Sequence, residues 1–291
     1  MKHRFIDIQK RSYPVKKLCR VLNVSRSGYY AARSRPPSAR RKRQWDLTSQ
    51  IQQIHAASRE TYGSPRIHAE LRAQGIECSR NTVAKLMRQA QIMPKAIRRF
   101  RVTTDSRNTK ASPNLVRRVF RVERPNTCWL TDITYISTRE GWLYLAAILD
   151  LYSRAIVGWS MSKTLDCKLA TDALRMALQS RGSGPKILHS DQGSTYATAA
   201  YRALLENQGI RQSMCRKGDC WDNAPMESFF HTLKTELVMH SDYKTREQAR
   251  ASVFDYVEVF YNRQRRHSSV RYEARITFEY QQSPHWCVHR T

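Results

Sequence analysis

The chain has 291 residues, and its 51 Lys and Arg against 24 Asp and Glu give a formal net charge of +27 at pH 7 and a pI near 10.3. This length allows two or three small domains, and a hydrophobic fraction of 41% is enough to form their cores. An excess charge of this size indicates a polyanionic partner or solvated tails, and the periodic apolar residues among the charges argue against tails. The longest apolar run, Trp142 to Leu151, is too short to span a bilayer, so no membrane partner is predicted.

The positive charge is concentrated in the first part of the chain. Residues 1–125 contain 30 Lys and Arg against 7 Asp and Glu, a net +23, whereas residues 126–291 contain 21 against 17, a net +4. The first part is therefore predicted to bind nucleic acid, and the second to be a more neutral globular domain. Seven cysteines without regular spacing, in a chain without a signal peptide, indicate a reducing cytoplasm.

Residues 14–32 have the pattern of a small helix-turn-helix. Ser25 is placed to cap the second of its helices, after a turn at Asn23-Val24. Residues 34–44 contain Pro-Pro among basic residues and are interpreted as a linker, with a helix following from about Trp45 to Ser58. The apolar face of the first helix consists of Val15, Leu18, Cys19 and Leu22.

Residues 62–92 repeat this pattern more clearly. A helix is predicted from Pro65 to about Gln74, Gly75 ends it, and Ser79 caps the next helix. A plain helical hairpin is the alternative interpretation, but the surrounding charge favours DNA binding. The side chains expected to face outward, and to reach phosphates and base edges, are Arg80, Asn81, Lys85 and Arg88.

The pattern changes to strands after residue 125. Three consecutive strands, then a helix opened by Asp166, then alternating strands and helices are the order of a ribonuclease-H-like α/β fold. The segment Trp142 to Tyr152 is apolar on both faces and is predicted to be a central strand. The predicted strands are 128–136, 142–152, 155–162, 186–190 and 210–214, and the predicted helices are 166–180, 197–208, one carrying Glu227, and 245–265.

Two acids lie at special positions in this second part. Asp191 follows a short apolar run, where a strand gives way to a loop. Glu227 falls in the first turns of a helix that Asn223 is placed to cap and in which Pro225 suits the first turn. An apolar stripe at helical period supports this helix, and it consists of Met226, Phe229, Phe230, Leu233 and Leu237.

A third acid, Asp132, lies inside the first predicted strand, where an Asp is disfavoured and its charge is expensive to bury. A hydrogen-bonded core Asp is the plain alternative, and Asp150 is a rival candidate. Asp132 is the better placed, because the first strand of this fold neighbours the fourth, which ends at Asp191. Carboxylates of this kind suit Mg²⁺, and two such ions about 3.5–4 Å apart are typical of nucleases and polymerases.

The strings WLTDITYI, DLYSRAIVGW, HSDQGSTY and NAPMESFFHTLKTEL resemble the D-D-E integrase core of the insertion-sequence-three transposases, in particular the second-frame (OrfB) product. Thirty-five residues separate Asp191 from Glu227, as in that family, and Lys234 follows Glu227 by seven. The family's C-terminal motif is partly present as Tyr261-Asn262, Arg265 and His267-Ser268. Arg271 replaces its usual Gly, and Ala274-Arg275 its usual Ser-Pro.

The resemblance implies that Asp132, Asp191 and Glu227 are the catalytic metal ligands, that they bind two Mg²⁺ with Mn²⁺ as a substitute, and that Lys234 binds DNA. It implies metal-dependent 3′-end cleavage and strand transfer without a covalent enzyme intermediate. The implied partners are the element's terminal repeats, target DNA, further copies of the chain on DNA, and an upstream-frame product or frameshift fusion. The implied location is the bacterial cytoplasm, at the nucleoid.

The expected domains are a helix-turn-helix with a basic linker, a second helix-turn-helix, a basic linker, a ribonuclease-H-like integrase catalytic core, and a C-terminal helix with a tail. They cover residues 1–44, 45–100, 101–125, 126–242 and 243–291. Two alternatives remain: a structure-selective nuclease of the same fold, which lacks strand transfer, and a non-enzymatic DNA-binding repressor that uses only residues 1–92.

Several further side chains are interpreted without a catalytic role. His189 and His231 are taken as structural or as substrate contacts. The aromatic side chains of Trp129, Tyr135 and Trp221 are expected in the core. A zinc site is not predicted from His285, Cys287 and His289, because their spacing fits no structural zinc pattern.

Overall fold

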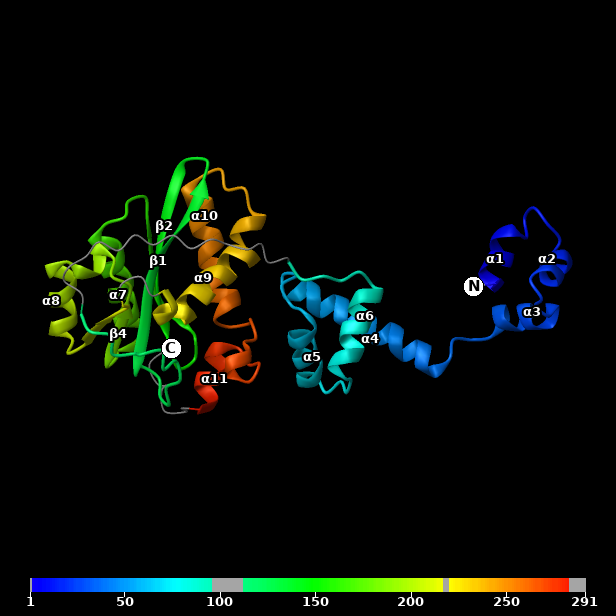
Figure 1. Cartoon of the computed structure of the whole chain (residues 1–291), viewed down its shortest axis with the longest axis horizontal. Helices are drawn as coiled ribbons and strands as arrows, with labels where there is room; N and C mark the ends of the chain where they lie inside the picture. The colour runs from blue at the N-terminus through cyan, green and yellow to red at the C-terminus, as the bar shows by residue number, and fades with distance from the viewer. Residues whose placement is uncertain (1, 96–111, 217–219, 283–291) are drawn as a thin grey trace. The chain divides into compact units, whose positions relative to one another are not determined.

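The computed structural model describes residues 2–95, 112–216 and 220–282, without the side chains of residues 220 and 221 (Figure 1). The chain divides into two compact units, Met1–Gln52 and Gln53–Thr291. The domain boundaries expected after residues 44, 100, 125 and 242 stay predictions. Within the described ranges, no helix combines the length and the apolar character needed to cross a bilayer. The His285, Cys287 and His289 group lies outside the described residues.

Three short helices fold together at the start of the first unit. The predicted helix pair is confirmed, and the Ser25 side chain caps α3 by accepting a hydrogen bond of 2.9 Å from the Gly28 N–H. The first helix was not predicted, because a single buried side chain, Ile6, gives it no apolar periodicity. The helices are α1 (Lys2–Gln9), α2 (Val15–Val21) and α3 (Arg26–Ser34), and Ile6, Leu18, Cys19 and Tyr29 form their core.

The helix α4 (Ala39–Ala57) crosses the boundary between the two units. It begins before the predicted start at Trp45, so residues 39–44 are helical and the expected linker is shorter. The Ser38 side chain accepts a hydrogen bond of 3.3 Å from the Arg41 N–H and so supports the first turn. The Arg and Lys residues that follow are good helix formers, which explains why a basic run continues the helix.

The second helix pair agrees with its prediction. It consists of α5 (Ser64–Ala73) and α6 (Arg80–Gln89). Gly75 takes a positive φ of 77° directly after α5, a conformation that favours glycine, and the Ser79 side chain caps α6 through the Thr82 N–H at 3.1 Å. The buried side chains between the helices are Ile67, Leu71, Val83, Leu86 and Met87.

The second unit contains one mixed five-stranded sheet of order β3-β2-β1-β4-β5. The first three strands are antiparallel neighbours, and β1 pairs with β4, and β4 with β5, in parallel. The predicted ribonuclease-H-like order is confirmed. The strands are β1 (Cys128–Thr138), β2 (Gly141–Asp150), β3 (Ile156–Ser162), β4 (Ile187–Ser190) and β5 (Arg211–Met214).

Helices cover both sides of the sheet, with α7 (Cys167–Arg181) and α8 (Ala199–Asn207) on one side and α9 (Ala224–Glu236) and α10 (Arg246–Phe254) on the other (Figure 1). Gly158 on β3 lets α7 come close, because a Cβ there would lie 2.4 Å from the Ala173 carbonyl oxygen. The main core on the α7 side includes Trp129, as expected, and is completed by Ile148, Leu174, Leu188, Tyr201 and Met214.

The C-terminal part differs from the single long helix that was expected for residues 245–265. After α10 the chain continues as a π-helical segment (Asp255–Tyr261), and a further helix, α11 (Arg275–Gln282), was not predicted as such. The side chains of Tyr256, Val257, Phe260 and Tyr261 are buried along the π-helical segment. The chain therefore stays helical from Arg246 to Tyr261, inside the predicted range, and only the type of helix differs over its last seven residues.

Candidate active site

The free edge of β1 brings two of the predicted carboxylates together. Among the described residues, β4 pairs with β1 only as far as Leu130, opposite His189, so beyond Leu130 no strand pairs with this edge of β1. Asp132 lies two residues beyond Leu130, and Asp191 directly follows β4. Burial and the nearby charge of Asp191 raise the pKa of Asp132 well above its usual value, and burial also raises the pKa of Asp191.

Backbone N–H groups orient both of these carboxylates. The Ile133 N–H donates a hydrogen bond of 2.7 Å to Asp132 Oδ1, and the Gly193 N–H donates one of 2.9 Å to Asp191 Oδ1. A Cβ at Gly193 would lie 2.9 Å from Asp191 Oδ1, so a larger residue there would crowd the carboxylate. The backbone therefore holds one oxygen of each side chain.

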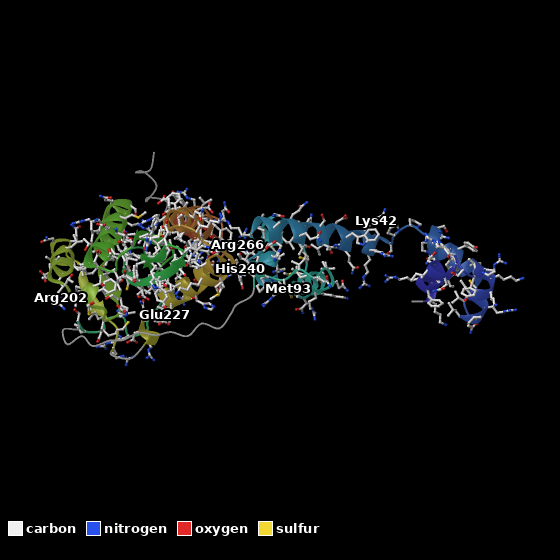
Figure 2. The ribbon with its side chains drawn as sticks, turned by 90° about the horizontal axis from the view of Figure 1, so that it is seen from above. Lys42, Met93, Arg202, Glu227, His240 and Arg266 are labelled. Atoms are coloured by element: carbon white, nitrogen blue, oxygen red, sulfur yellow. The ribbon has the colours of Figure 1, made fainter. Side chains whose placement is uncertain are left out.

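Glu227, labelled in Figure 2, lies in the first turn of α9. Burial raises its pKa, and its charge is among the causes that raise the pKa of Asp132. Pro225 occupies the first turn of the helix, as predicted. Asn223 stands at the cap position, but its side chain does not cap the helix, which corrects the prediction. Its amide instead donates a hydrogen bond of 3.3 Å to the Thr131 carbonyl and ties the start of α9 to β1.

The charges of Asp191 and Glu227 both act on Asp132, but the three carboxylates do not form a complete coordination group. Among the described residues, no three His, Cys, Asp or Glu side chains converge closely enough to hold an ion. The donor chemistry nevertheless fits Mg²⁺, which prefers carboxylate oxygens. Repulsion between desolvated carboxylates opposes their close approach, and a divalent cation would remove that repulsion.

The alternative candidate acid, Asp150, has a structural role. Its side chain is fully buried and accepts hydrogen bonds from the Asn126 N–H at 3.0 Å and the Tyr152 N–H at 2.9 Å. Arg181 lies 3.8 Å away. Burial raises the pKa of Asp150 to about 6, although Arg181 lowers it. These contacts hold the end of β2 to neighbouring segments and explain an acid on a strand that is apolar on both faces.

His189 is a structural residue. It is fully buried, and its Nδ1 lies 2.8 Å from the Ser213 hydroxyl, across the β4–β5 pairing. Burial lowers the pKa of His189 to about 4, so the imidazole is neutral at physiological pH. His231 lies on α9 and is half-buried.

Asp222 is a site-supporting residue that the sequence reasoning missed. Its carboxylate is fully buried and accepts hydrogen bonds from Asn114 at 2.7 Å, Arg118 at 3.0 Å and Arg216 at 3.1 Å. Burial alone would raise the pKa of Asp222, but Arg216 and Arg118 hold it well below its usual range. Asp222 thus anchors one distant segment, which carries Asn114 and Arg118, and the neighbouring Arg216 directly before α9. An acid just before a predicted helix was the available signal, but a helix cap would have given the same pattern.

Lys234 is more buried than a lysine on a solvated helix face would be, and Tyr135 is more exposed than a core residue. Lys234 is only 9% exposed, and its Nζ lies 4.7 Å from the centroid of the Tyr135 ring. Its charge is also among those that act on Asp132. Tyr135, expected in the core, is 44% exposed, because this end of β1 extends beyond β4. The side chain of Trp221 lies outside the described residues.

The C-terminal motif holds α9 against the sheet. The Asn262 side chain exchanges two hydrogen bonds with the backbone of Ile156 on β3, at 3.0 and 2.9 Å. Arg265 donates two hydrogen bonds to the carboxylate of Glu236, the last residue of α9, at 2.7 and 2.5 Å. Tyr261 packs edge-on against Phe229 of α9, with ring centroids 4.8 Å apart. The motif therefore positions the helix that carries Glu227.

The turn whose usual Gly and Pro are replaced is formed in the structure. Arg271 takes the left-handed conformation with φ of 57°, which is strained by about 1 kcal/mol for a residue with a Cβ. Arg275 is fully buried and donates hydrogen bonds to the carbonyls of Arg154, Tyr261 and Arg265. These bonds join the start of α11 to the motif and to the β2–β3 connection.

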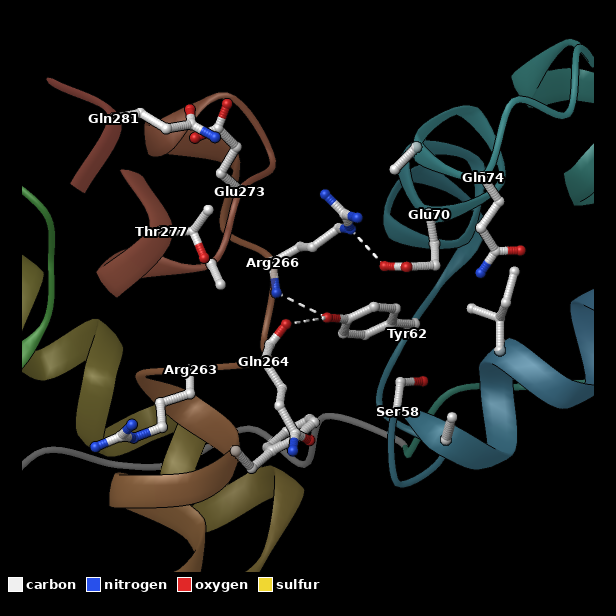
Figure 3. Close-up of a pocket in the computed structure, with 15 residues that line it drawn as sticks. Ser58, Tyr62, Glu70, Gln74, Arg263, Gln264, Arg266, Glu273, Thr277 and Gln281 are labelled. Atoms are coloured by element: carbon white, nitrogen blue, oxygen red, sulfur yellow. Dashed lines mark hydrogen bonds and ion pairs between the residues drawn. The ribbon is translucent and has the colours of Figure 1, made fainter. Parts of the chain in front are cut away.

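The four outward residues predicted on α6, Arg80, Asn81, Lys85 and Arg88, are all exposed. The helix pair contacts the C-terminal motif through α5 and the residues before it (Figure 3). The Arg266 N–H donates a hydrogen bond of 2.7 Å to the Tyr62 hydroxyl, and the Arg266 guanidinium pairs with Glu70. A cavity of about 630 Å³ lies beside this contact, lined in part by Gln74, Arg263 and Glu273.

Comparison with known proteins gives consistent matches along the chain. Integrase core domain families match residues 122–220 and 227–282, and an HTH-like domain family matches residues 43–100. The chain is 43% identical over 273 residues to "Transposase InsF for insertion sequence IS3A" of Escherichia coli K12, covering 92% of this chain and 94% of that protein. It is 44% identical over 253 residues to "Insertion element IS600 uncharacterized 31 kDa protein" of Shigella sonnei, covering 86% and 93%.

Solved structures are more distant. A simian T-cell lymphotropic virus intasome in complex with PP2A regulatory subunit B56 gamma aligns with a TM-score of 0.48 and 15% identity, over 79% of this chain and 74% of that one. The HTLV-2 integrase catalytic core domain in complex with magnesium aligns with a TM-score of 0.42 and 16% identity, over 54% of this chain and 97% of that one.

Proposed function

The chain belongs to the IS3 family of insertion-sequence transposases, and we propose that Asp132, Asp191 and Glu227 form the site at which it cuts the ends of its element and joins them to target DNA. The observation that supports this assignment is that Asp132, on β1 beyond its pairing with β4, is desolvated and lies within the electrostatic influence of both Asp191 and Glu227. Desolvated acids that gather in this way are typical of a site built for a cation.

The three side chains would hold two Mg²⁺ ions, with Mn²⁺ as a substitute. Bound ions would activate the attacking oxygen and stabilise the leaving oxygen of a phosphodiester. The protein would supply the carboxylate oxygens of Asp132 from β1, of Glu227 from α9 and of Asp191 from the end of β4. The Ile133 and Gly193 N–H groups each hold one carboxylate oxygen, which leaves the second oxygen of Asp132 and of Asp191 to face the substrate.

The exposed residues of α6, Arg80, Asn81, Lys85 and Arg88, are proposed to contact DNA. Their side chains have the donors that reach phosphates and base edges from a recognition helix. No acidic residue occurs in α6 to oppose them. The terminal repeats of the element and the target DNA are the proposed substrates, which places the activity at the nucleoid. Holding two DNA ends at once is the reason to propose several copies on DNA, and an upstream-frame product or fusion would add further DNA contacts.

An assay with the full chain tests the proposed function. Inverted repeats around the coding region define the DNA ends, and duplexes carrying one such end are incubated with Mg²⁺ or Mn²⁺. We expect nicking that leaves a 3′-hydroxyl, followed by joined products, and no product in the presence of EDTA. Cut ends without any joined product, under conditions where both DNA partners are bound, would instead identify a nuclease and contradict the proposal.

Lys234 is proposed to contact the DNA next to the scissile phosphate. It follows Glu227 by seven residues, about two helical turns and roughly 10 Å along α9. Its side chain points toward Tyr135 and Asp132 rather than into solvent. As a flexible point charge it can follow a phosphate without fixing its geometry. Burial lowers its pKa, and the charge of Asp132 opposes that shift.

Lys234→Met is expected to weaken the binding of element ends and to lower cleavage and joining, while the melting temperature changes little. Methionine keeps an unbranched stem in the buried site and removes only the charge. Lys234→Arg is expected to keep much of the function. End binding is measured by fluorescence anisotropy, and joining on a gel. A Met variant that binds and joins ends as the parent does would show that the charge has no role with DNA.

A further inference from the structure

Two aromatic side chains lie half-exposed beside each other on the β1–β2 hairpin. Tyr135 is 44% exposed and Trp142 is 49% exposed, and their rings meet edge to face with centroids 4.9 Å apart. In the strand register Tyr135 stands opposite Tyr144 and Trp142 opposite Ser137, so the two rings are diagonal neighbours on one face of the sheet. About half of each large apolar side chain is thus in contact with water.

Lys234 links this pair to the carboxylates. Its Nζ lies 4.7 Å from the Tyr135 ring centroid, and its charge acts on Asp132. Tyr135 follows Asp132 by three residues on β1, about 10 Å along an extended strand, and the odd spacing puts the two side chains on opposite faces of the sheet. A DNA strand that reaches both would therefore pass around the edge of β1 that β4 leaves open beyond Leu130.

The charges around the pair fit nucleic acid. Arg246 donates from Nε to the Trp142 carbonyl at 3.0 Å, and Lys234 stands over the Tyr135 ring. Glu140 lies beside these cations and accepts a hydrogen bond of 2.9 Å from the Arg246 N–H. Exposed rings flanked by two cations combine the two features by which proteins bind single-stranded DNA, stacking and attraction to phosphate.

We propose that Tyr135 and Trp142 form a stacking site for an unpaired base at the DNA end that is processed at the carboxylates. This proposal rests on the proposed function and adds the part of the substrate that is recognised. A paired base inside a duplex is covered on both faces by its neighbours, so only a base released from the stack can meet these rings. A frayed or melted end supplies such a base most readily.

The test compares two DNA duplexes of the same length with the full chain, in EDTA so that no cleavage occurs. One duplex is blunt, and the other carries about four mismatched base pairs at one end, which keeps the number of phosphates equal and frees bases for stacking. Fluorescence anisotropy gives the ratio of the two affinities. We expect the parent to prefer the mismatched end, and Tyr135→Ala and Trp142→Ala each to reduce that preference by about 5- to 100-fold.

Two further variants make the comparison specific. Tyr135→Phe keeps the ring and is expected to keep the preference. Phe254→Ala is the matched control, because Phe254 on α10 is 51% exposed and also pairs edge to face with a tryptophan, Trp159, at 5.9 Å. Its removal is expected to leave the affinity ratio unchanged. Melting temperatures of all variants show whether the fold is retained.

The proposal is overturned if both alanine variants keep the parental ratio, or if they weaken both duplexes equally. It is also overturned if they change the oligomeric state in size-exclusion chromatography at an unchanged ratio, because the pair would then be a contact between copies. Asp132→Asn separates this proposal from the proposed function. It should keep the preference for the mismatched end even though it is expected to be inactive.

Discussion

Asp132→Asn is expected to abolish both DNA cleavage and strand transfer, and Asp191→Asn and Glu227→Gln are expected to do the same. Each change removes one carboxylate from a site where three are shared, and an amide is a poor ligand for a divalent cation. A loss of several kcal/mol of transition-state stabilisation corresponds to at least about a 1000-fold slower reaction. The measurement is the yield of nicked and joined DNA in the assay described above.

The fold and DNA binding should survive these substitutions. Asp132 and Asp191 are desolvated, and their pKa values are raised, so neutral amides of nearly the same shape are expected to melt at the same temperature as the parent or above it without metal. Asp172→Asn is a matched control, because Asp172 lies on α7 in ion pairs with Lys168 and Arg175. Full activity in any one of the three site variants would remove that residue from the proposed site.

Arg265→Ala is expected to give the largest loss of stability. Arg265 and Glu236 have side chains only 3% and 10% exposed, and they share two hydrogen bonds. Burial alone would lower the pKa of Arg265, but Glu236 raises it above its usual value, which shows that the pair is strongly coupled. Breaking a buried pair by removing one partner typically costs about 3–5 kcal/mol, because the remaining charge stays buried.

For a unit of this size such a loss corresponds to a melting temperature lower by roughly 10 °C. Arg265→Lys should recover only part of it, because lysine cannot donate two parallel hydrogen bonds to one carboxylate. Arg263→Ala, at an exposed position two residues away, should leave the melting temperature nearly unchanged. An Arg265→Ala variant that melts with the parent would show that Glu236 does not depend on this partner. Thermal melts followed by circular dichroism provide the comparison.

The motif contacts also connect stability with activity. Glu236 ends the helix that begins near Glu227, and the Tyr256 hydroxyl donates to the same carboxylate at 2.7 Å. Arg66 from α5 approaches it to 3.8 Å. The end of α9 is therefore held by the motif and by the helix pair together. This explains why residues far from the acids in sequence belong to one structural unit with them.

Much of the fold follows from local patterns. The strands β1 to β5, the helices α5 to α9 and the caps at Ser25, Ser79 and Asp166 depend on side chains within a few positions of each other, so their periodicity and chemistry are visible in the sequence. The prediction of a linker up to residue 44 was wrong for residues 39–44, which are helical. A charged segment next to Pro-Pro has the composition of a linker, although Arg and Lys are good helix formers. The π-helical segment lies inside the range predicted as one helix, and only its helix type differs from the expectation.

The sequence by itself determined the strands, the helices and the class of fold, because these are set by residues near one another in the chain. It also identified the candidate acids, because each lies in a short motif of its own that resembles the family. Only the tertiary structure decided which side chains are buried. Tyr135 is half-exposed because β4 is shorter than β1, and Lys234 is buried because α9 lies along that free edge. The partners of Asp222 and of Arg265 come from distant segments, so no local pattern could have identified them. Burial and pairing depend on which segment covers which, and that is decided by the packing of the whole unit.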